Sequence, residues 1–150
     1  MDSVNGTEIL LNEMAPIVSA VFETMLDMEA SRTETAWSPG PDRVIASISL
    51  SGEWNGVIDL ECDHRQACRF AARFLRDDDP PCVMARDVLG ELINMIGGNL
   101  KCALTSGIAL SSPSIAEDTA RGASGGPEHH VAFRCSEGTF WVGLLAARSA

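Results

Sequence analysis

Several common chemical signatures are missing from this sequence, and each absence removes a class of function. The five cysteines include no C-x-x-C pair, and their odd number fits a disulfide framework poorly. The sequence also contains no H-E-x-x-H zinc motif and no G-x-x-x-x-G-K-[ST] phosphate loop. We therefore expect reduced thiols, and we expect neither a metal ion nor a nucleotide to be bound by this chain.

Positive charge is also scarce. Ten arginines and a single lysine, Lys101, leave a formal net charge of −10, which would repel the phosphates of nucleic acid or of an anionic membrane. No basic amino-terminal region precedes an apolar core, so no signal peptide is predicted. No apolar run approaches the ~20 residues that a bilayer crossing needs. These absences predict a cytoplasmic protein without a nucleic-acid or membrane partner.

The three histidines do not indicate a metal site. His129 and His130 begin a predicted strand, in which neighbouring side chains point to opposite faces. His64 lies in the first turn of a predicted helix, where we expect it to be solvated. Four of the cysteines (Cys68, Cys82, Cys102 and Cys135) are expected to be small buried apolar groups.

The 150 residues suit one domain, residues 1–150, that buries roughly two-thirds of its unfolded surface. Residues 7–28 have apolar positions at helical spacing, with Pro16 in the first turn or at a kink. Residues 30–43 are predicted to form a loop. Two β-hairpins are predicted, at residues 44–62 and at 129–147, the second turning near Ser136–Gly138.

Two further helices lie between these hairpins. Asp63 can cap a helix over residues 64–75, and a long helix runs from about residue 83 to 105. Residues 108–115 are a candidate strand interrupted at Pro113, and the polar segment 117–128 is a candidate loop. The sequence leaves the structure of residues 107–130 undetermined. The order of elements predicts an α+β fold, in which helices pack on an antiparallel sheet.

The long helix has a polar side and an apolar side. At about 100° per residue, one stripe carries Asp87, Glu91, Asn94, Gly98 and Lys101. Asn99 falls on the opposite, apolar side, so we expect a buried amide whose hydrogen bonds are satisfied. Asn94, beside Glu91, is expected to be exposed. Periodicity alone favours an ordinary solvated helix face.

Gly97 and Gly98 stand together inside this helix, where each costs roughly 1 kcal/mol relative to alanine. Gly97 could permit close packing on the inside, and Gly98 could leave a gap on the polar stripe. That gap would let another surface approach Glu91 and Asn94. The alternative is that both glycines serve a tight helix–sheet contact or a kink.

The ordered set Asp87-x-x-x-Glu91-x-x-Asn94, continued by "NMIGGNLK", resembles the CheX-like chemotaxis phosphatases, which are relatives of CheC and FliY. The segments "APIVSAVFETML" and "SGEWNGVIDLECDHRQACRFAARFL" are similar to the same family, so the likeness covers most of residues 8–110. Only eighteen residues separate Asn94 from Pro113, fewer than in the family pattern. CheC-type relatives carry a second Glu/Asn pair, whereas the first helix here has none, so one site per chain is expected.

The resemblance implies an enzyme that hydrolyses the aspartyl phosphate of a CheY-like response-regulator receiver domain. Asn94 would orient the attacking water and Glu91 would contact a receiver lysine, while Asp87, Gly98 and Lys101 would contact the partner. Mg²⁺ is expected on the receiver, and no cofactor on this chain. The resemblance also implies a homodimer through sheet edges, for which the strand pair Val131–Leu145 is suited. The alternative is a non-catalytic module of the same fold that binds receivers or flagellar switch proteins. The sequence names neither the cognate receiver nor the pathway.

Overall fold

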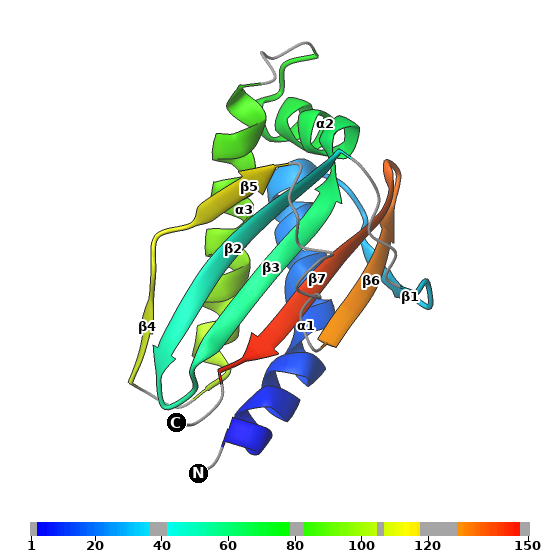
Figure 1. The fold of residues 1–150 in the computed structure, drawn as a ribbon. Coiled ribbons are helices and arrows are strands. Elements are labelled where there is room, and N and C mark those ends of the chain that lie inside the picture. The colour runs from blue at the N-terminus through cyan, green and yellow to red at the C-terminus, as the bar shows by residue number, and fades with distance from the viewer. Residues whose placement is uncertain (1–2, 37–41, 79–82, 105–106, 118–128, 148–150) are drawn as a thin grey trace.

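The protein is an antiparallel sheet with helices on one face, as the computed structural model in Figure 1 shows. The structure describes residues 3–36, 42–78, 83–104, 107–117 and 129–147. In these ranges the helices are α1 (Ser3–Leu26), α2 (His64–Leu75) and α3 (Met84–Cys102). The strands are β1 (Ser31–Thr33), β2 (Arg43–Gly52), β3 (Gly56–Asp63), β4 (Ile108–Leu110), β5 (Ser114–Glu117), β6 (His129–Cys135) and β7 (Gly138–Ala146). This arrangement confirms the predicted α+β class.

The strand order is β1-β6-β7-β3-β2-β4, and β5 also pairs with β2 beyond the end of β4. Both predicted hairpins are confirmed, as β2–β3 and β6–β7. The interrupted strand is confirmed too, because β4 and β5 pair with different parts of β2 on either side of Pro113. The predicted loop at 117–128 lies outside the described residues except for Glu117, which ends β5.

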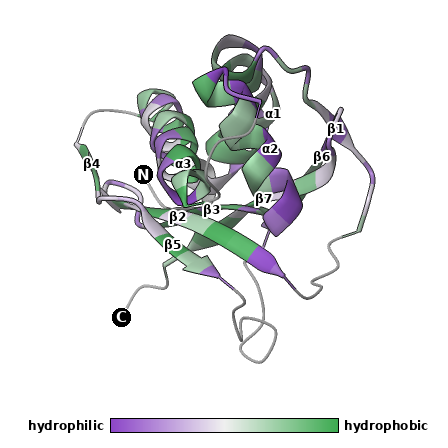
Figure 2. Cartoon of the chain, turned by 90° about the horizontal axis from the view of Figure 1, so that it is seen from above, coloured by the Kyte–Doolittle hydropathy of each residue, from purple (hydrophilic) through white to green (hydrophobic). Residues whose placement is uncertain are grey.

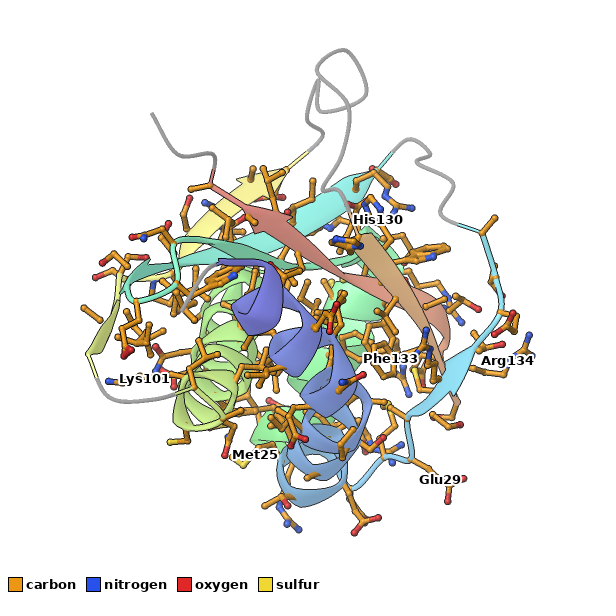
Figure 3. The ribbon with its side chains drawn as sticks, turned by 90° about the horizontal axis from the view of Figure 1, so that it is seen from below. Met25, Glu29, Lys101, His130, Phe133 and Arg134 are labelled. Atoms are coloured by element: carbon orange, nitrogen blue, oxygen red, sulfur yellow. The ribbon has the colours of Figure 1, made fainter. Side chains whose placement is uncertain are left out.

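The core fills the space between the sheet and the helices. Figure 2, coloured by residue hydropathy, shows hydrophobic residues along the strands and helices that enclose this space. Alternate residues of the strands face this layer. In β6, for example, Phe133 is fully buried beneath the helices while Arg134 is exposed (Figure 3). The Phe22 ring of α1 stacks on Phe140 of β7 with ring centroids 4.6 Å apart, and Phe70 of α2 meets Phe22 edge-on at 5.2 Å. The aromatic cluster therefore joins α1 and α2 to the sheet.

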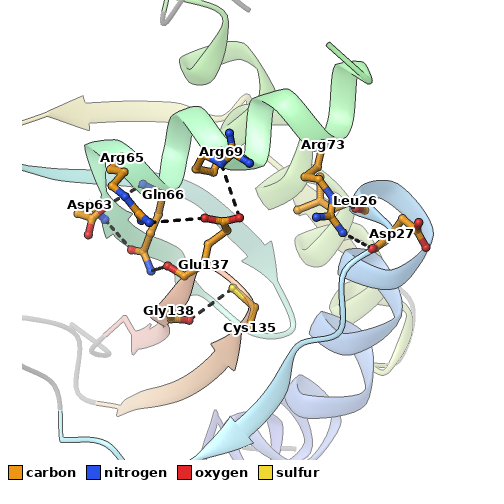
Figure 4. A network of polar contacts seen from close by, with 10 residues as sticks. All are labelled: Leu26, Asp27, Asp63, Arg65, Gln66, Arg69, Arg73, Cys135, Glu137 and Gly138. Atoms are coloured by element: carbon orange, nitrogen blue, oxygen red, sulfur yellow. Dashed lines mark hydrogen bonds and ion pairs between the residues drawn. The ribbon is translucent and has the colours of Figure 1, made fainter. Parts of the chain in front are cut away.

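Hydrogen bonds fix α2 against the sheet, as Figure 4 shows. Asp63 and Gln66 form a capping box, in which the Asp63 carboxylate accepts from the Gln66 N–H at 2.7 Å, so the predicted cap is confirmed. The Gln66 amide donates to the Thr139 carbonyl of β7 at 2.8 Å. At the other end of α2, Arg73 donates to the Leu26 carbonyl at 3.0 Å. These contacts hold the first residue of α2, His64, at a fixed place beside β5.

α1 is longer than predicted at its start, so Pro16 lies inside the helix and the first-turn placement is wrong. The stretch Gly6–Leu26 has the length and the mean hydropathy, 1.4, of a membrane-spanning helix, which the sequence search for an apolar run did not anticipate. Here one side of that helix packs in the core through Leu10, Met14 and Phe22. Core helices pass the same length and hydropathy test, so the observation is weak evidence for a membrane.

The segment predicted as a loop at 30–43 contains a short strand, β1, and at Ser31–Thr33 that prediction is wrong. Its three residues are polar and carry no strand signal, yet they pair with β6. β7 lies between β6 and β3, and β1 covers the outer side of β6 only at Ala132–Arg134. Among the described residues, no strand pairs with the outer side of His129–Val131. A homodimer through this strand pair stays a prediction.

Candidate functional site

α3 matches the predicted long helix and places the Glu-x-x-Asn pair in solvent. Asp87 lies in its first turn and Lys101 in its last, the arrangement that the helix dipole favours. Its buried side packs against the sheet and the other helices; the buried residues are Ala85, Val88, Leu89, Leu92, Ile93, Ile96, Gly97 and Leu100. Glu91 and Asn94 are exposed, and no helix break separates them.

A cleft of about 650 Å³ runs along the exposed side of α3. α3 forms one wall and the edge segment from β4 to β5 forms the other. The lining residues of α3 are Arg86, Asp87, Gly90, Glu91 and Asn94, and those of the opposite wall are Leu110, Ser111, Ser112, Pro113 and Ile115. Asp87, Glu91 and Asn94 thus share one cleft, whereas Gly98 and Lys101 do not line it.

The two walls approach each other at Gly90 and Pro113. A Cβ atom added at Gly90 would lie 3.7 Å from the Pro113 Cβ, which is ordinary van der Waals contact. Pro113 therefore lies opposite Gly90, one helical turn from Asn94. It does so although the sequence separation between Asn94 and Pro113 is shorter than in the family pattern. Ser111, in the wall opposite α3, is bonded to β2. Its N–H donates to the Ser49 carbonyl at 3.0 Å, and its hydroxyl accepts from the Ser49 N–H at 2.9 Å.

A charged bridge lies next to the cleft, in a neighbouring pocket that shares Arg86 with it. Glu117 of β5 contacts His64 Nε2 through Oε1 at 2.7 Å and accepts a hydrogen bond from Arg86 Nη1 through Oε2. The hydrogen bonds from His64 and then from Arg86 hold the pKa of Glu117 below its usual value. His64 was expected to be solvated in the first turn of a helix; its side chain is 41% exposed there, but its imidazole is also paired with Glu117, which was not predicted.

The two glycines of α3 differ sharply. A Cβ at Gly97 would lie 2.9 Å from Ile48 Cγ2 of β2, closer than packed side chains tolerate, so the predicted close approach on the inside is confirmed. A Cβ at Gly98 would meet only Leu110 Cδ1, at 3.9 Å. Gly98 therefore lies on the side of α3 that faces Leu110 of β4. Lys101, labelled in Figure 3, lies about one turn further toward the carboxyl end of the helix. Their contact with a partner stays a prediction.

The prediction of a buried Asn99 is wrong. Asn99 is exposed, and its amide donates to the Met95 carbonyl of its own helix at 2.8 Å. The helical wheel placed Asn99 on the apolar side of α3. In the structure its side chain faces the groove beside α1, and α1 does not cover it. α1 and α3 leave a groove there, lined by Pro16, Ile17, Ala20, Val21, Thr24, Met25, Met95 and Asn99. The amide consequently needs no buried partner.

None of the cysteines that the structure describes lines the cleft. Cys62 is buried, Cys68 and Cys135 are half-buried, and Cys102 is exposed, so the buried prediction fails for Cys102, while Cys82 lies outside the described residues. Burial raises the pKa of the Cys62 and Cys135 thiols, which therefore stay protonated at neutral pH. Among the residues that the structure describes, no group of three or more His, Cys, Asp or Glu side chains is arranged to hold a metal ion.

Sequence reasoning missed the second wall and the charged bridge. Ser111–Pro113 was read only as an interruption of a strand, and neither Arg86 nor Glu117 was singled out. The register of β5 on β2, Val44 with Glu117, is what brings Glu117 beside the start of α2. No local pattern encodes that pairing. The short sequence separation between Asn94 and Pro113 was the one signal in the sequence that could have placed the Ser111–Pro113 wall near α3.

Comparisons with known proteins agree on one family. The sequence model of the chemotaxis phosphatase CheX matches residues 44–134, and no curated protein matches the sequence significantly. The chain is similar to chemotaxis protein CheX from Vibrio vulnificus, with a TM-score of 0.74 and 16% identity over 92% of this chain and 96% of that one. It is similar to the structure of the CheX–CheY–BeF₃–Mg²⁺ complex from Borrelia burgdorferi, with a TM-score of 0.71 and 16% identity over 95% and 97% of the two chains.

A more distant likeness extends to Thermotoga maritima FliY, with a TM-score of 0.65 and 10% identity over 98% of this chain and 92% of that one. At these identities the solved structures show a shared fold. The sequence model, which covers more than half of the chain and includes the whole of α3, shows the family. This protein belongs to the family of the chemotaxis phosphatase CheX.

Proposed function

We propose that the protein hydrolyses the aspartyl phosphate of a CheY-like response-regulator receiver domain. The single observation that carries the proposal is the exposure of Glu91 and Asn94 together on one side of α3, inside one cleft. The family is that of a chemotaxis phosphatase, and the similar structure from Borrelia burgdorferi contains CheX together with CheY. Both facts support a receiver domain as the partner.

The chemistry needs little from this chain. An acyl phosphate already reacts with water, so the remaining task is to place a water in line with the phosphorus, which is a task of positioning and electrostatics. The Asn94 carboxamide can donate to a water and accept from it at once. A carboxamide also holds the water without becoming phosphorylated itself.

Glu91 would set the docking register. Its carboxylate, exposed three residues before Asn94, can form a charge-assisted contact with a lysine of the receiver. Because the i,i+3 spacing puts both side chains on one side of the helix, α3 alone can enter the receiver's site. Asp87 lies one turn earlier in the same cleft and would contact the partner there. Mg²⁺ would belong to the receiver, where it neutralises charge on the phosphoryl oxygens.

The formal charge of −10 disfavours long-range attraction to an acidic receiver pocket. Recognition would therefore depend on the local fit of the cleft. The shape of the cleft, set by Gly90 and Pro113, consequently matters as much as its charges.

The test is to follow the decay of phosphorylated candidate receivers with the wild-type protein and with Asn94→Ala. We expect the wild type to accelerate decay, and Asn94→Ala to lose roughly 100-fold of that acceleration through misplacement of the water. Binding of the receiver should be retained. Asn99→Ala is the matched control, since it removes an exposed amide of the same helix that lies outside the cleft.

The alternative is a non-catalytic module that binds receivers or flagellar switch proteins. It predicts that wild type and Asn94→Ala bind a receiver equally and that neither changes its rate of decay. That result, obtained across all receivers of the organism, would replace the phosphatase proposal.

A further inference from the structure

The second wall of the cleft is an edge of the sheet that is attached along one side only. β4 and β5 both pair with β2, and among the described residues no strand pairs with their outer side. Ser111, Ser112 and Pro113 are all exposed; Ser111 is bonded to Ser49, and its hydroxyl donates to the Ser112 carbonyl at 3.0 Å. A contact from the helical side would fix the distance of this wall from α3.

Glu117 supplies such a contact. Its carboxylate joins the first residue of α2, His64, to the third residue of α3, Arg86. Arg86 also donates from Nη2 to the Ile115 carbonyl of β5 at 3.4 Å, so its guanidinium contacts the wall strand twice. The hydrogen bonds from His64 and Arg86 also lower the pKa of Glu117, as expected for a carboxylate that accepts from both.

Arg86 is itself part of the cleft. It is the only cation among the described residues that line it, and it shares that lining with the carboxylates of Asp87 and Glu91. Because the Arg86 guanidinium binds Glu117 and the Ile115 carbonyl, it stays beside β5. Glu91 is then available to a cation of the partner. Without Glu117, a long and mobile guanidinium would remain in the same cleft as Glu91.

We propose that Glu117 is a positioning residue for the proposed phosphatase site. It holds Arg86 and the Ser111–Pro113 wall at a fixed distance from Glu91 and Asn94, and so keeps the cleft open to the receiver. The inference rests on the proposed function, because its role is defined by receiver docking. Exposed ion pairs contribute little to stability. The effect of losing Glu117 should therefore appear in docking and not in the unfolding midpoint.

The experiment compares Glu117→Gln with Glu137→Gln. Glu137 is a matched control, since its carboxylate also contacts two cationic side chains, Arg69 at 3.6 Å and Arg65 at 3.9 Å (Figure 4). Glu137 does not line the cleft. With a phosphorylated receiver as substrate, we expect Glu117→Gln to raise KM about fivefold or more with kcat within about twofold. Asn94→Ala should instead lower kcat and leave KM nearly unchanged. Equal KM values for the two glutamine variants, or a fall in kcat alone for Glu117→Gln, would overturn the proposal.

A second measurement does not depend on activity. Amide hydrogen exchange of residues 110–117 in the protein alone should be faster in Glu117→Gln than in the wild type and unchanged in Glu137→Gln. Unchanged exchange in Glu117→Gln would overturn the positioning role even if the protein is an active phosphatase. Conversely, a wild type that accelerates the decay of no receiver would refute the proposed function, while faster exchange would still support the control of the wall by Glu117.

Discussion

The two long helices, α1 and α3, lie on the same face of the sheet and both expose acidic and amide side chains, yet the polar cleft described above is lined by residues of α3 and by none of α1. α1 exposes Asn12 and Glu13, which are adjacent in sequence and so point about 100° apart on a helix. Glu91 and Asn94 of α3 lie three residues apart and project to one side. The groove beside α1, which Pro16, Ile17 and Met25 help to line, is mainly apolar.

The comparison shows that exposed Glu and Asn side chains do not make a site by themselves. On α3 a second wall faces them, with Pro113 against Gly90, and the bridge through Glu117 ties that wall to the start of the helix. Asn12 and Glu13 line neither this cleft nor the groove between α1 and α3. The functional difference between the helices therefore lies in what surrounds them as much as in their own residues.

The largest expected difference concerns the two glutamates. Glu91→Ala should lower kcat/KM for a phosphorylated receiver roughly 10- to 100-fold, the loss of a charge-assisted hydrogen bond of about 1.5–3 kcal/mol. Glu13→Ala should leave kcat/KM within about twofold, because Glu13 lies outside the cleft. Steady-state assays of both variants measure the contrast. A similar loss in the two variants would mean that α1 also contacts the receiver, and the comparison would fail.

A smaller contrast lies within α3. Gly97→Ala should lower the free energy of unfolding by about 1–2 kcal/mol, because overpacking against Ile48 outweighs the gain in helix propensity. Gly98→Ala should raise it by up to about 1 kcal/mol, since its Cβ fits beside Leu110. Denaturant titrations check both signs. A raised KM in Gly98→Ala would show in addition that the partner reaches this position, as the polar stripe predicts.

The smallest effect is expected at Asn99. Asn99→Ala should change the free energy of unfolding by less than about 0.5 kcal/mol, because the amide is exposed and bonds only within its own helix in the contacts described above. Thermal unfolding beside the wild type is sufficient to measure it. A loss above about 2 kcal/mol would restore the original view of a buried amide and would change the boundary of the groove between α1 and α3.

The sequence was sufficient to predict α3, the exposure of Glu91 and Asn94, and both hairpins, because each depends on local periodicity or turn chemistry. Asn99 shows where periodicity stops being informative. A helical wheel gives the direction of a side chain, whereas burial depends on how far the neighbouring element extends, and α1 leaves a groove at that level.

The remaining errors share a long-range cause. β1 consists of three polar residues whose strand conformation comes from pairing with β6, about a hundred residues later in the chain. Glu117 likewise meets His64 and Arg86 only because β5 pairs with β2. Such pairings are set by the tertiary fold, and propensity at the segment itself carries almost no information about them.

The interruption of the edge at Ser111–Pro113 has a consequence for solubility. An uninterrupted outer strand presents a row of free amide and carbonyl groups on which a foreign strand can align and begin an aggregate. Here that row is divided into pieces of three and four residues, and Pro113 in the gap has no amide hydrogen to offer. The same proline that shapes the cleft thus makes this margin a poor template for amyloid-like growth.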